Sequence, residues 1–303
     1  KEARLDSGFS ATVGDNRLLR QRTTWFERQL IDTQLVGEFT FGDLSADVRA
    51  SYANTTRDSP YERSFSYEFN EEVGDFVNNL RTNGQSANVA FSELEENLYA
   101  GAIDLAYNAP VDFDLTVSAG YAYTDTSRNS LRRAFVYRSD QALPSSVTQA
   151  RPDYLISDFV VRQYDLTLRE QAAGGEVIEY DAGLEIHAGY AQIEAEPIDY
   201  VRGTLGVRYE DASQSIDTFD IFGGVGTGGD ASLVNTRLDN DYFLPAGTLT
   251  WNFAEDMQFR VAGSRTIARP QFRELAPQQF LDIESNRTFI GNQFLQDSEL
   301  TNA

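Results

Sequence analysis

The residues best suited to acid–base chemistry lie in the stretch SELEENLY, where Glu93, Glu95 and Glu96 form a short acidic cluster. Two carboxyl groups can act as acid and base in glycoside hydrolysis when they flank the scissile bond. Nothing in the sequence places a second carboxylate opposite this cluster, and a run of charge in a loop is usually only solvated. We therefore expect no catalytic residues and no enzymatic activity.

The composition removes further kinds of chemistry. The chain of 303 residues has no Cys, which excludes disulfides, thiol chemistry and Cys-type zinc sites. Its one His, His187, lies in the alternating run GLEIHAGYAQIE and is expected on the polar face of a strand. The regular acidic spacing of a calcium loop is missing. We expect no metal site and no cofactor, and the net charge of −22 argues against nucleic acid as a partner.

An aromatic and charged stretch is the first candidate for ligand binding. SPYERSFSYEF, from Ser59 to Phe69, sets Tyr61, Phe65 and Tyr67 beside Glu62. Sugars are commonly held by stacking on aromatic rings and by hydrogen bonds to carboxylates. The alternative for this stretch is a hairpin that packs its aromatic rings on itself.

A basic stretch is the second candidate. RNSLRRAFVYR contains Arg132 and Arg133, whose guanidinium groups could bind the phosphates of lipopolysaccharide or an anionic ligand. A solvated extension of a strand is the alternative. The sequence does not decide between the two.

The elements that position these residues are strands with alternating faces. In GTLTWNFAEDMQFRVAGS, Leu249, Trp251 and Phe253 share one face of a strand, and Phe259 and Val261 share one face of the next. The opposite faces are polar. This pattern fits a soluble sandwich with its core inside, and it fits equally a membrane barrel with lipid outside.

Short and long connections alternate along the chain. The short ones are expected at Gly42-Asp43, Ala109 to Asp112, Glu194 to Asp199 and Ala254 to Asp256. The long polar ones run from Asn54 to about Glu95, from Thr126 to about Val177, and through the glycine-rich stretch FGGVGTGGDASL. Strands connected in this way form an up-and-down antiparallel sheet with all its short turns at one end.

The asymmetry between the two ends favours an outer-membrane barrel over a sandwich, which mixes short and long connections at both ends. The strands reach the roughly 9 to 11 residues that a tilted crossing of a bilayer needs. Tyrosines at strand ends suit the interface with the lipid headgroups. No stretch is apolar for the roughly 18 residues of a membrane helix.

Several motifs resemble those of TonB-dependent receptors. DYFLPAGTLTWNFAEDMQFRVAGSRTIARPQFRELAP is similar to a late hairpin of that barrel, and GYAQIEAEPIDYVRGTLGVRYEDAS, with its Gly206 to Glu210 run, is similar to the preceding one. FIGNQFLQDSELTNA resembles the stretch that leads into the next strand. The matching residues of the late hairpin are Leu244, Pro245, Arg265, Thr266, Arg269 and Pro270.

The resemblance implies an all-β fold: an antiparallel up-and-down meander that forms part of a barrel of about 22 strands, with short periplasmic turns and long extracellular loops. Residues 1–303 would be a partial barrel domain that lacks the signal peptide, the plug and the closing strands. Such a wall faces lipid with Leu249, Trp251, Phe253, Phe259 and Val261.

The resemblance also implies a function and its partners. The protein would be a receptor in the outer membrane of a Gram-negative bacterium that captures a scarce ligand, with carbohydrate favoured and siderophore next. Its partners would be outer-membrane lipid and lipopolysaccharide, its own plug, the TonB-ExbB-ExbD complex, and a small-molecule or oligosaccharide ligand. A soluble β-sandwich binding module or adhesin is the alternative, and a β-rich glycan hydrolase is the remaining one.

Overall fold

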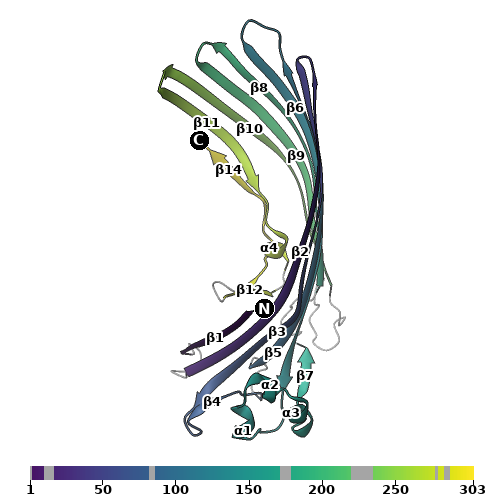
Figure 1. Cartoon of the computed structure of the whole chain (residues 1–303), viewed down its shortest axis with the longest axis vertical. Helices are drawn as coiled ribbons and strands as arrows, with labels where there is room; N and C mark the ends of the chain where they lie inside the picture. Colours follow the sequence, from purple (N-terminus) through teal and green to yellow (C-terminus); the bar gives the residue numbers. More distant parts are fainter. Residues whose placement is uncertain are drawn as a thin grey trace. The chain divides into compact units, whose positions relative to one another are not determined.

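The structure is a computed structural model. It describes residues 2–9, 17–81, 86–170, 179–219, 235–276, 279–282 and 287–303. Most of these residues lie in β-strands (Figure 1), of which the strand that begins at Leu44 has 27 residues. No helix in these ranges has the length and hydropathy that crossing a membrane requires. The glycine-rich stretch at 222–233 falls outside the ranges.

The elements follow one another in chain order. The strands are β1 (Glu2–Phe9), β2 (Arg17–Phe41), β3 (Leu44–Asn70), β4 (Asp75–Val77), β5 (Ala87–Asn108), β6 (Asp114–Arg138), β7 (Thr167–Glu170), β8 (Glu179–Ile198), β9 (Val201–Phe219), β10 (Thr236–Ala254), β11 (Met257–Ala268), β12 (Gln279–Asp282), β13 (Arg287–Ile290) and β14 (Ser298–Asn302). The short helices are α1 (Ser145–Thr148), α2 (Pro152–Leu155), α3 (Asp158–Gln163) and α4 (Phe272–Leu275).

The strands pair in the order of the sequence. The main sheet has the order β1-β2-β3-β5-β6-β8-β9-β10-β11-β14, while β4 pairs with β3, β7 pairs with β6, and β12 and β13 form a separate pair. The register of β9 and β10 runs without a break from Thr236 opposite Ile216 to Trp251 opposite Val201. The expected all-β, antiparallel, up-and-down meander is confirmed.

The four short turns lie at one end of the sheet, as expected (Figure 1, upper end). Hydrogen bonds join neighbouring hairpins at this end of the sheet. The backbone N–H of Asn108 donates to Asp43 O at 2.9 Å, and that of Asn252 donates to Tyr200 O at 2.9 Å. Gly42 has a φ of +63°, a conformation that glycine adopts without steric cost, so a two-residue turn can close this hairpin.

One of these turns is shorter than the sequence predicts. Glu194 to Ile198 continue β8, so only Asp199 and Tyr200 form the turn. The register with β9 shifts between Ala195 and Ile198, and Pro197 lies within this irregularity. A proline lacks the N–H that a regular ladder needs, and strands tolerate it at such bulges.

The segments predicted as long loops contain long stretches of strand, so the prediction was wrong for these stretches. β3 continues to Asn70, β5 begins at Ala87 and β6 runs to Arg138. β1 and the first half of β2 were not predicted either. Polar and charged residues are frequent in these segments and hide the apolar alternation, although the backbone ladder continues.

The chain divides into two compact units, which are described separately. The first unit comprises Lys1–Gln29, Thr56–Leu94 and Ser130–Ile178. The second unit comprises Leu30–Thr55, Glu95–Asn129 and Glu179–Ala303.

The second unit has an exposed apolar face. Leu249 lies directly opposite Val261, and Trp251 lies opposite Phe259, so these side chains share one side of the sheet. Leu205 and Ile193 extend the same side across β9 and β8. The five residues predicted to face lipid are between 46% and 55% exposed: Leu249 50%, Trp251 50%, Phe253 46%, Phe259 55% and Val261 52%.

Aromatic residues lie at both edges of this apolar face. Trp251 and Phe253 lie near the short turns, with ring centroids 5.4 Å apart. Tyr121 and Tyr209, each 46% exposed, lie farther along the strands toward the other end. Aromatic girdles at both edges of an apolar band are typical of outer-membrane barrels.

The placement of His187 on a polar face was wrong. Counting by twos from Ile193 puts His187 on the apolar side of β8, where its Nδ1 is 2.6 Å from the hydroxyl oxygen of Tyr121. Its ring centroid lies 4.9 Å from that of Tyr123. The prediction was wrong because a polar side chain was assigned to the polar face. At the edge of the apolar region, among the tyrosines, the apolar side of the sheet also carries polar groups.

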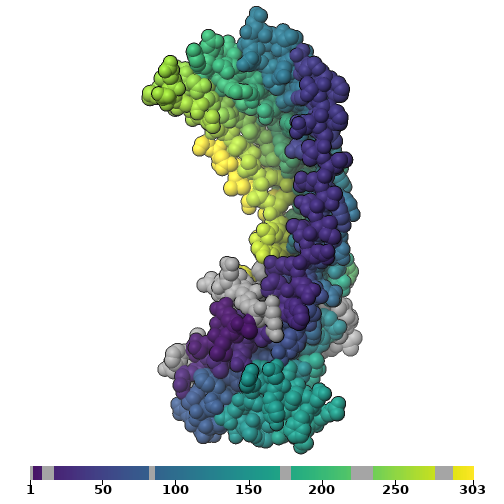
Figure 2. Space-filling view, viewed as in Figure 1, coloured from purple at the N-terminus to yellow at the C-terminus, as the bar shows by residue number. Residues whose placement is uncertain are grey.

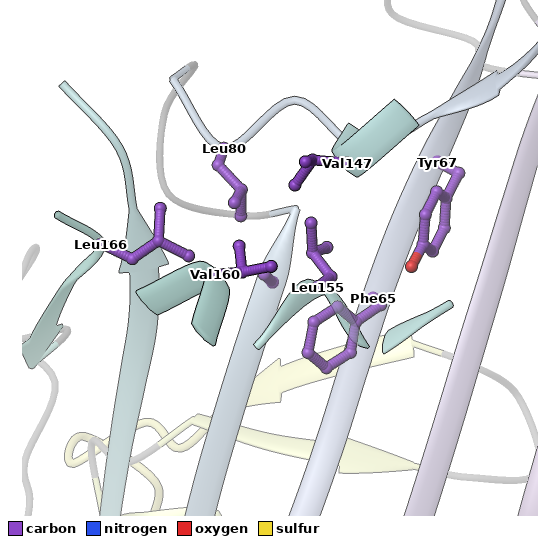
Figure 3. Packing of buried hydrophobic residues seen from close by; sticks show 8 residues of the cluster. Phe65, Tyr67, Leu80, Val147, Leu155, Val160 and Leu166 are labelled. Carbon is purple, nitrogen blue, oxygen red and sulfur yellow. The ribbon is translucent and has the colours of Figure 1, made fainter. Parts of the chain in front are cut away.

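The first unit has a small hydrophobic core of its own (Figure 3). Its fully buried members include Phe65 from β3, Leu155 from α2 and Val160 from α3. Polar contacts hold the connecting segments: the Asn78 side-chain amide donates to Ser66 O at 3.0 Å and to Ser86 O at 2.8 Å. The remaining core residues are Tyr67, Leu80, Ala87, Val147 and Leu166.

Spin labels at Leu249, Trp251 and Phe259 should test the lipid contact of the apolar face. In the complete, membrane-inserted protein, labels at these positions should collide with oxygen more often than with a water-soluble relaxant, because oxygen concentrates in the bilayer. A label at Thr250, on the opposite face, is the matched control. Higher accessibility to the water-soluble reagent at the three apolar positions would contradict a lipid-facing wall.

The substitution Leu155→Ala should destabilise the core of the first unit. Removing a fully buried leucine side chain costs on the order of 2–5 kcal/mol. Hydrogen exchange followed by mass spectrometry should show faster exchange in residues 145–166. Leu168→Ala, which truncates a side chain that is 51% exposed, should leave exchange there nearly unchanged. Equal effects of the two substitutions would mean that this core is not a cooperative unit.

Candidate functional site

The aromatic stretch predicted to bind ligand lies on β3 in the first unit. Phe65 is 1% exposed and Tyr67 is 4% exposed, because both rings belong to the hydrophobic core. The Tyr67 hydroxyl donates to Ala150 O at 2.9 Å, and burial raises the pKa of Tyr67. The packing of rings on the protein itself, weighed above as the alternative, therefore describes Phe65 and Tyr67.

Tyr61 differs from these two rings because it is only partly buried. The guanidinium carbon of Arg63 lies 4.4 Å from the centroid of its ring. Partial burial raises the pKa of the Tyr61 hydroxyl. Tyr61 is the member of the predicted aromatic set that keeps surface available for contact.

The two predicted arginines on β6 are paired with carboxylates. Arg133 donates from Nε and from Nη2 to the two carboxylate oxygens of Glu170, both at 2.8 Å, and this pair joins β6 to β7. Arg132 lies 3.9 Å from Glu62, so the structure brings these two predicted residues together. A bidentate pair such as Arg133–Glu170 fixes geometry as well as charge. Arg133 therefore acts first as a connection between strands.

The acidic cluster lies on β5, and its side chains are divided between the two faces of the sheet. Glu95 and Glu96 are consecutive residues of β5 and point to opposite faces of the sheet. Glu96 accepts a hydrogen bond from Arg128 Nε at 2.7 Å, and Glu95 accepts one from Asn54 at 3.3 Å. Among the residues that the structure describes, no group of three or more His, Asp or Glu side chains could hold a metal ion.

A cavity of about 270 Å³ in the first unit was missed by the sequence analysis. Three neighbouring strands and the start of a helix bring its charged residues together. Figure 2 shows the purple, blue and teal segments of this unit side by side. Its lining comes from β1 (Ala3, Arg4, Leu5), β2 (Gln21, Arg22, Thr23), β3 (Arg63, Phe65) and the beginning of α2 (Arg151, Pro152, Asp153). Four of these side chains are arginines. We call this cavity the arginine pocket.

The sequence alone does not reveal the pocket, because its residues come together only through the strand pairing. Arg4 and Arg22 are direct partners in the antiparallel register of β1 and β2. Arg63 and Arg151 reach the same place from segments that are 88 positions apart (151 − 63). β1 was not predicted, so this grouping could not be found from spacing.

In the second unit, two segments that carried the family resemblance contact each other. Glu210, at the end of the Gly206 to Glu210 run, accepts hydrogen bonds from Arg208 Nε at 2.7 Å and from Arg269 Nη2 at 2.8 Å. The Gln214 side chain donates to Pro270 O at 2.9 Å. These contacts hold the segment that follows β11 against β9, so Arg269 and Pro270 position the chain.

The other motif residues lie where the pairing of β11 with β10 on one edge ends and its pairing with β14 on the other edge begins. Pairing of β10 with β11 ends at Ala246 opposite Ser264, and Pro245, which has no N–H to donate, is the next residue of β10. From Ser264 onward β11 pairs with β14. Arg265 forms an ion pair with Glu299 at 2.7 Å, Thr266 lies opposite Leu300, and Leu244 precedes the proline.

A family model described as "TonB dependent receptor-like, beta-barrel" matches residues 3–302. No curated protein matches the chain. Solved structures with a similar fold include the unliganded ferric citrate transporter FecA, with 12% identity over 83% of this chain and 28% of that one, at a TM-score of 0.48. The siderophore receptor PiuA from Acinetobacter baumannii has 11% identity over 87% and 36%, at a TM-score of 0.45.

The ferric-catecholate import receptor Fiu from E. coli K12, in its closed form, has 10% identity over 91% of this chain and 46% of that one, at a TM-score of 0.41. The chain thus spans less than half the length of each of these three proteins. At such identities the likeness concerns the fold alone. The family model, in contrast, covers nearly the whole chain, and we conclude that the chain belongs to the TonB-dependent receptor β-barrel family of the Gram-negative outer membrane.

Proposed function

We propose that residues 1–303 are an internal portion of the barrel domain of a receptor that binds a scarce extracellular ligand and imports it into the periplasm with TonB-coupled energy. One observation carries the proposal. The sheet of the second unit presents an apolar face, bracketed by aromatic residues, that the described residues do not cover. Lipid is the solvent that such a face requires.

The open edge of β2 supports the view that more strands belong to the receptor. β1 pairs with β2 only between Arg17 and Thr24, so within the described residues the stretch from Trp25 to Phe41 has β3 on one side and no strand on the other. Unpaired backbone groups are costly in lipid, and barrels avoid them by closing. Further strands would continue the sheet at this edge.

The partners follow from this placement. The apolar face would contact outer-membrane lipid, and the ends of the long strands would reach the lipopolysaccharide. A plug inside the barrel would hold the ligand until the TonB-ExbB-ExbD complex acts on it. No bond in the ligand is made or broken, because release needs only a change in the relative affinities of two states of the plug.

The proposed ligand class depends on side chains of the first unit, which contains the predicted aromatic stretch on β3 and the helices α1, α2 and α3. The expectation of a carbohydrate depended on three rings for stacking, and two of them lie in the core. Tyr61, beside Arg63, remains as a contact for a sugar ring or for a siderophore. No observation favours a soluble sandwich module, an adhesin or a glycan hydrolase over a receptor.

Uptake by whole cells should depend on TonB. Cells with the complete receptor would be offered labelled neutral oligosaccharides, acidic oligosaccharides and ferric siderophores. The compound that binds at the surface should accumulate in the periplasm, chemically unaltered, and deletion of tonB should abolish accumulation while leaving surface binding intact. Accumulation that persists without TonB, or release of an altered product, would contradict the proposal.

A further inference from the structure

The arginine pocket has the opposite charge to the rest of the chain. The whole sequence contains 47 acidic and 25 basic residues. The pocket lining contains four arginines, Arg4, Arg22, Arg63 and Arg151, and one acidic residue, Asp153. A concentration of guanidinium groups in an acidic protein needs a physical reason, because like charges gathered in one place repel one another.

Two of these arginines lie face to face across a strand pair. Arg4 is the direct partner of Arg22 in the register of β1 and β2, and like charges in this position destabilise a sheet. Asp6 offsets part of the repulsion through its 2.8 Å contact with Arg4 Nε. Arg22 is only 8% exposed, and burial together with the nearby Arg20 lowers its pKa.

The other two arginines come from β3 and from the residue that precedes α2. Arg63 donates from Nη1 to Asp153 at 2.9 Å, and the ring of Tyr61 lies beside its guanidinium group. Arg151 lies on the surface at the start of α2. Among the described residues, its side chain has no hydrogen-bond or ion-pair partner. Its five N–H donors are therefore available to a ligand.

We propose that the arginine pocket binds an oxyanion, a carboxylate or phosphate group carried by a small acidic solute. Guanidinium groups match both kinds of oxyanion through paired N–H donors. A bound anion would also relieve the repulsion between Arg4 and Arg22. The cavity, at about 270 Å³, suits one molecule of monosaccharide size or the charged end of a larger ligand.

The pocket also explains how the first unit could select a ligand. This part of the inference rests on the proposed receptor function, whereas anion binding itself does not. An acidic sugar and its neutral counterpart have similar shapes, and the arginines would distinguish them by charge. Discrimination of this kind requires groups that are left unsatisfied by the wrong ligand.

Binding can be tested on the purified complete receptor with D-glucuronate as the probe and D-glucose as its neutral counterpart. Saturation-transfer NMR titrations should show that glucuronate binds and that glucose binds at least about tenfold more weakly, since hydrogen bonds to charged groups contribute that much or more. Arg151→Gln should weaken glucuronate binding about tenfold for the same reason. Arg169→Gln, an exposed arginine of β7 outside the pocket lining, should leave it unchanged.

Asp153→Asn should increase the affinity for glucuronate, a result that a misfolded variant would not give. This substitution removes the negative charge of the lining and keeps an oxygen that can accept the hydrogen bond from Arg63. Glucuronate binding should become tighter, by about threefold for a partly exposed charge. Unchanged or weaker binding in this variant, with a wild-type circular dichroism spectrum, would overturn the proposal.

Inorganic phosphate as a competitor then separates the two oxyanions. Stronger displacement by phosphate than by acetate assigns the site to phosphate groups, and the reverse assigns it to carboxylates; both results support an anion site. Equal binding of glucuronate and glucose, or an unaffected Arg151→Gln variant, would overturn it. TonB-dependent uptake is measured separately, so failure of the anion site and failure of the receptor function are distinguishable.

Discussion

Hydrogen bonding of the backbone is the constraint on which the rest of this structure depends. In lipid, every N–H and C=O of a strand needs a partner on the next strand, because no water is present to replace it. The unbroken register between β9 and β10, from Ile216 and Thr236 to Val201 and Trp251, satisfies this requirement. Consecutive pairing fixes the alternation of faces, and that alternation puts Leu249, Trp251 and Val261 on one side.

In the first unit, side-chain packing rather than strand pairing alone supports the arginine pocket. Phe65 belongs to the hydrophobic core and also lines the arginine pocket. Leu155, which is fully buried, lies two residues after Asp153 on the same short helix, so the core fixes the position of the pocket's carboxylate. The apolar core thus holds charged groups in a defined arrangement, although none of its own side chains contacts solvent to a significant extent.

The sequence predicted those parts of the structure that follow from local periodicity. Alternation identified the apolar face at Trp251 and Phe259, and Gly42 identified a tight turn. Periodicity failed where charged and polar residues are frequent along the strands, so β1 and the far halves of β3, β5 and β6 were missed. Composition alone could not distinguish a buried ring from an accessible one, as Phe65 and Tyr67 show. The arginine pocket depends on the partnership of Arg4 with Arg22, and a strand register is a long-range property that no single segment encodes.

The most direct test of the account is an experimental structure of the complete receptor in a lipid nanodisc. The central claim is that the sheet is a single-layered membrane wall. The account predicts ordered acyl chains against Leu249, Trp251 and Val261, and a neighbouring strand hydrogen-bonded along β2 from Trp25 to Phe41. A second protein layer packed on that apolar face, with water at the edge of β2, would contradict it.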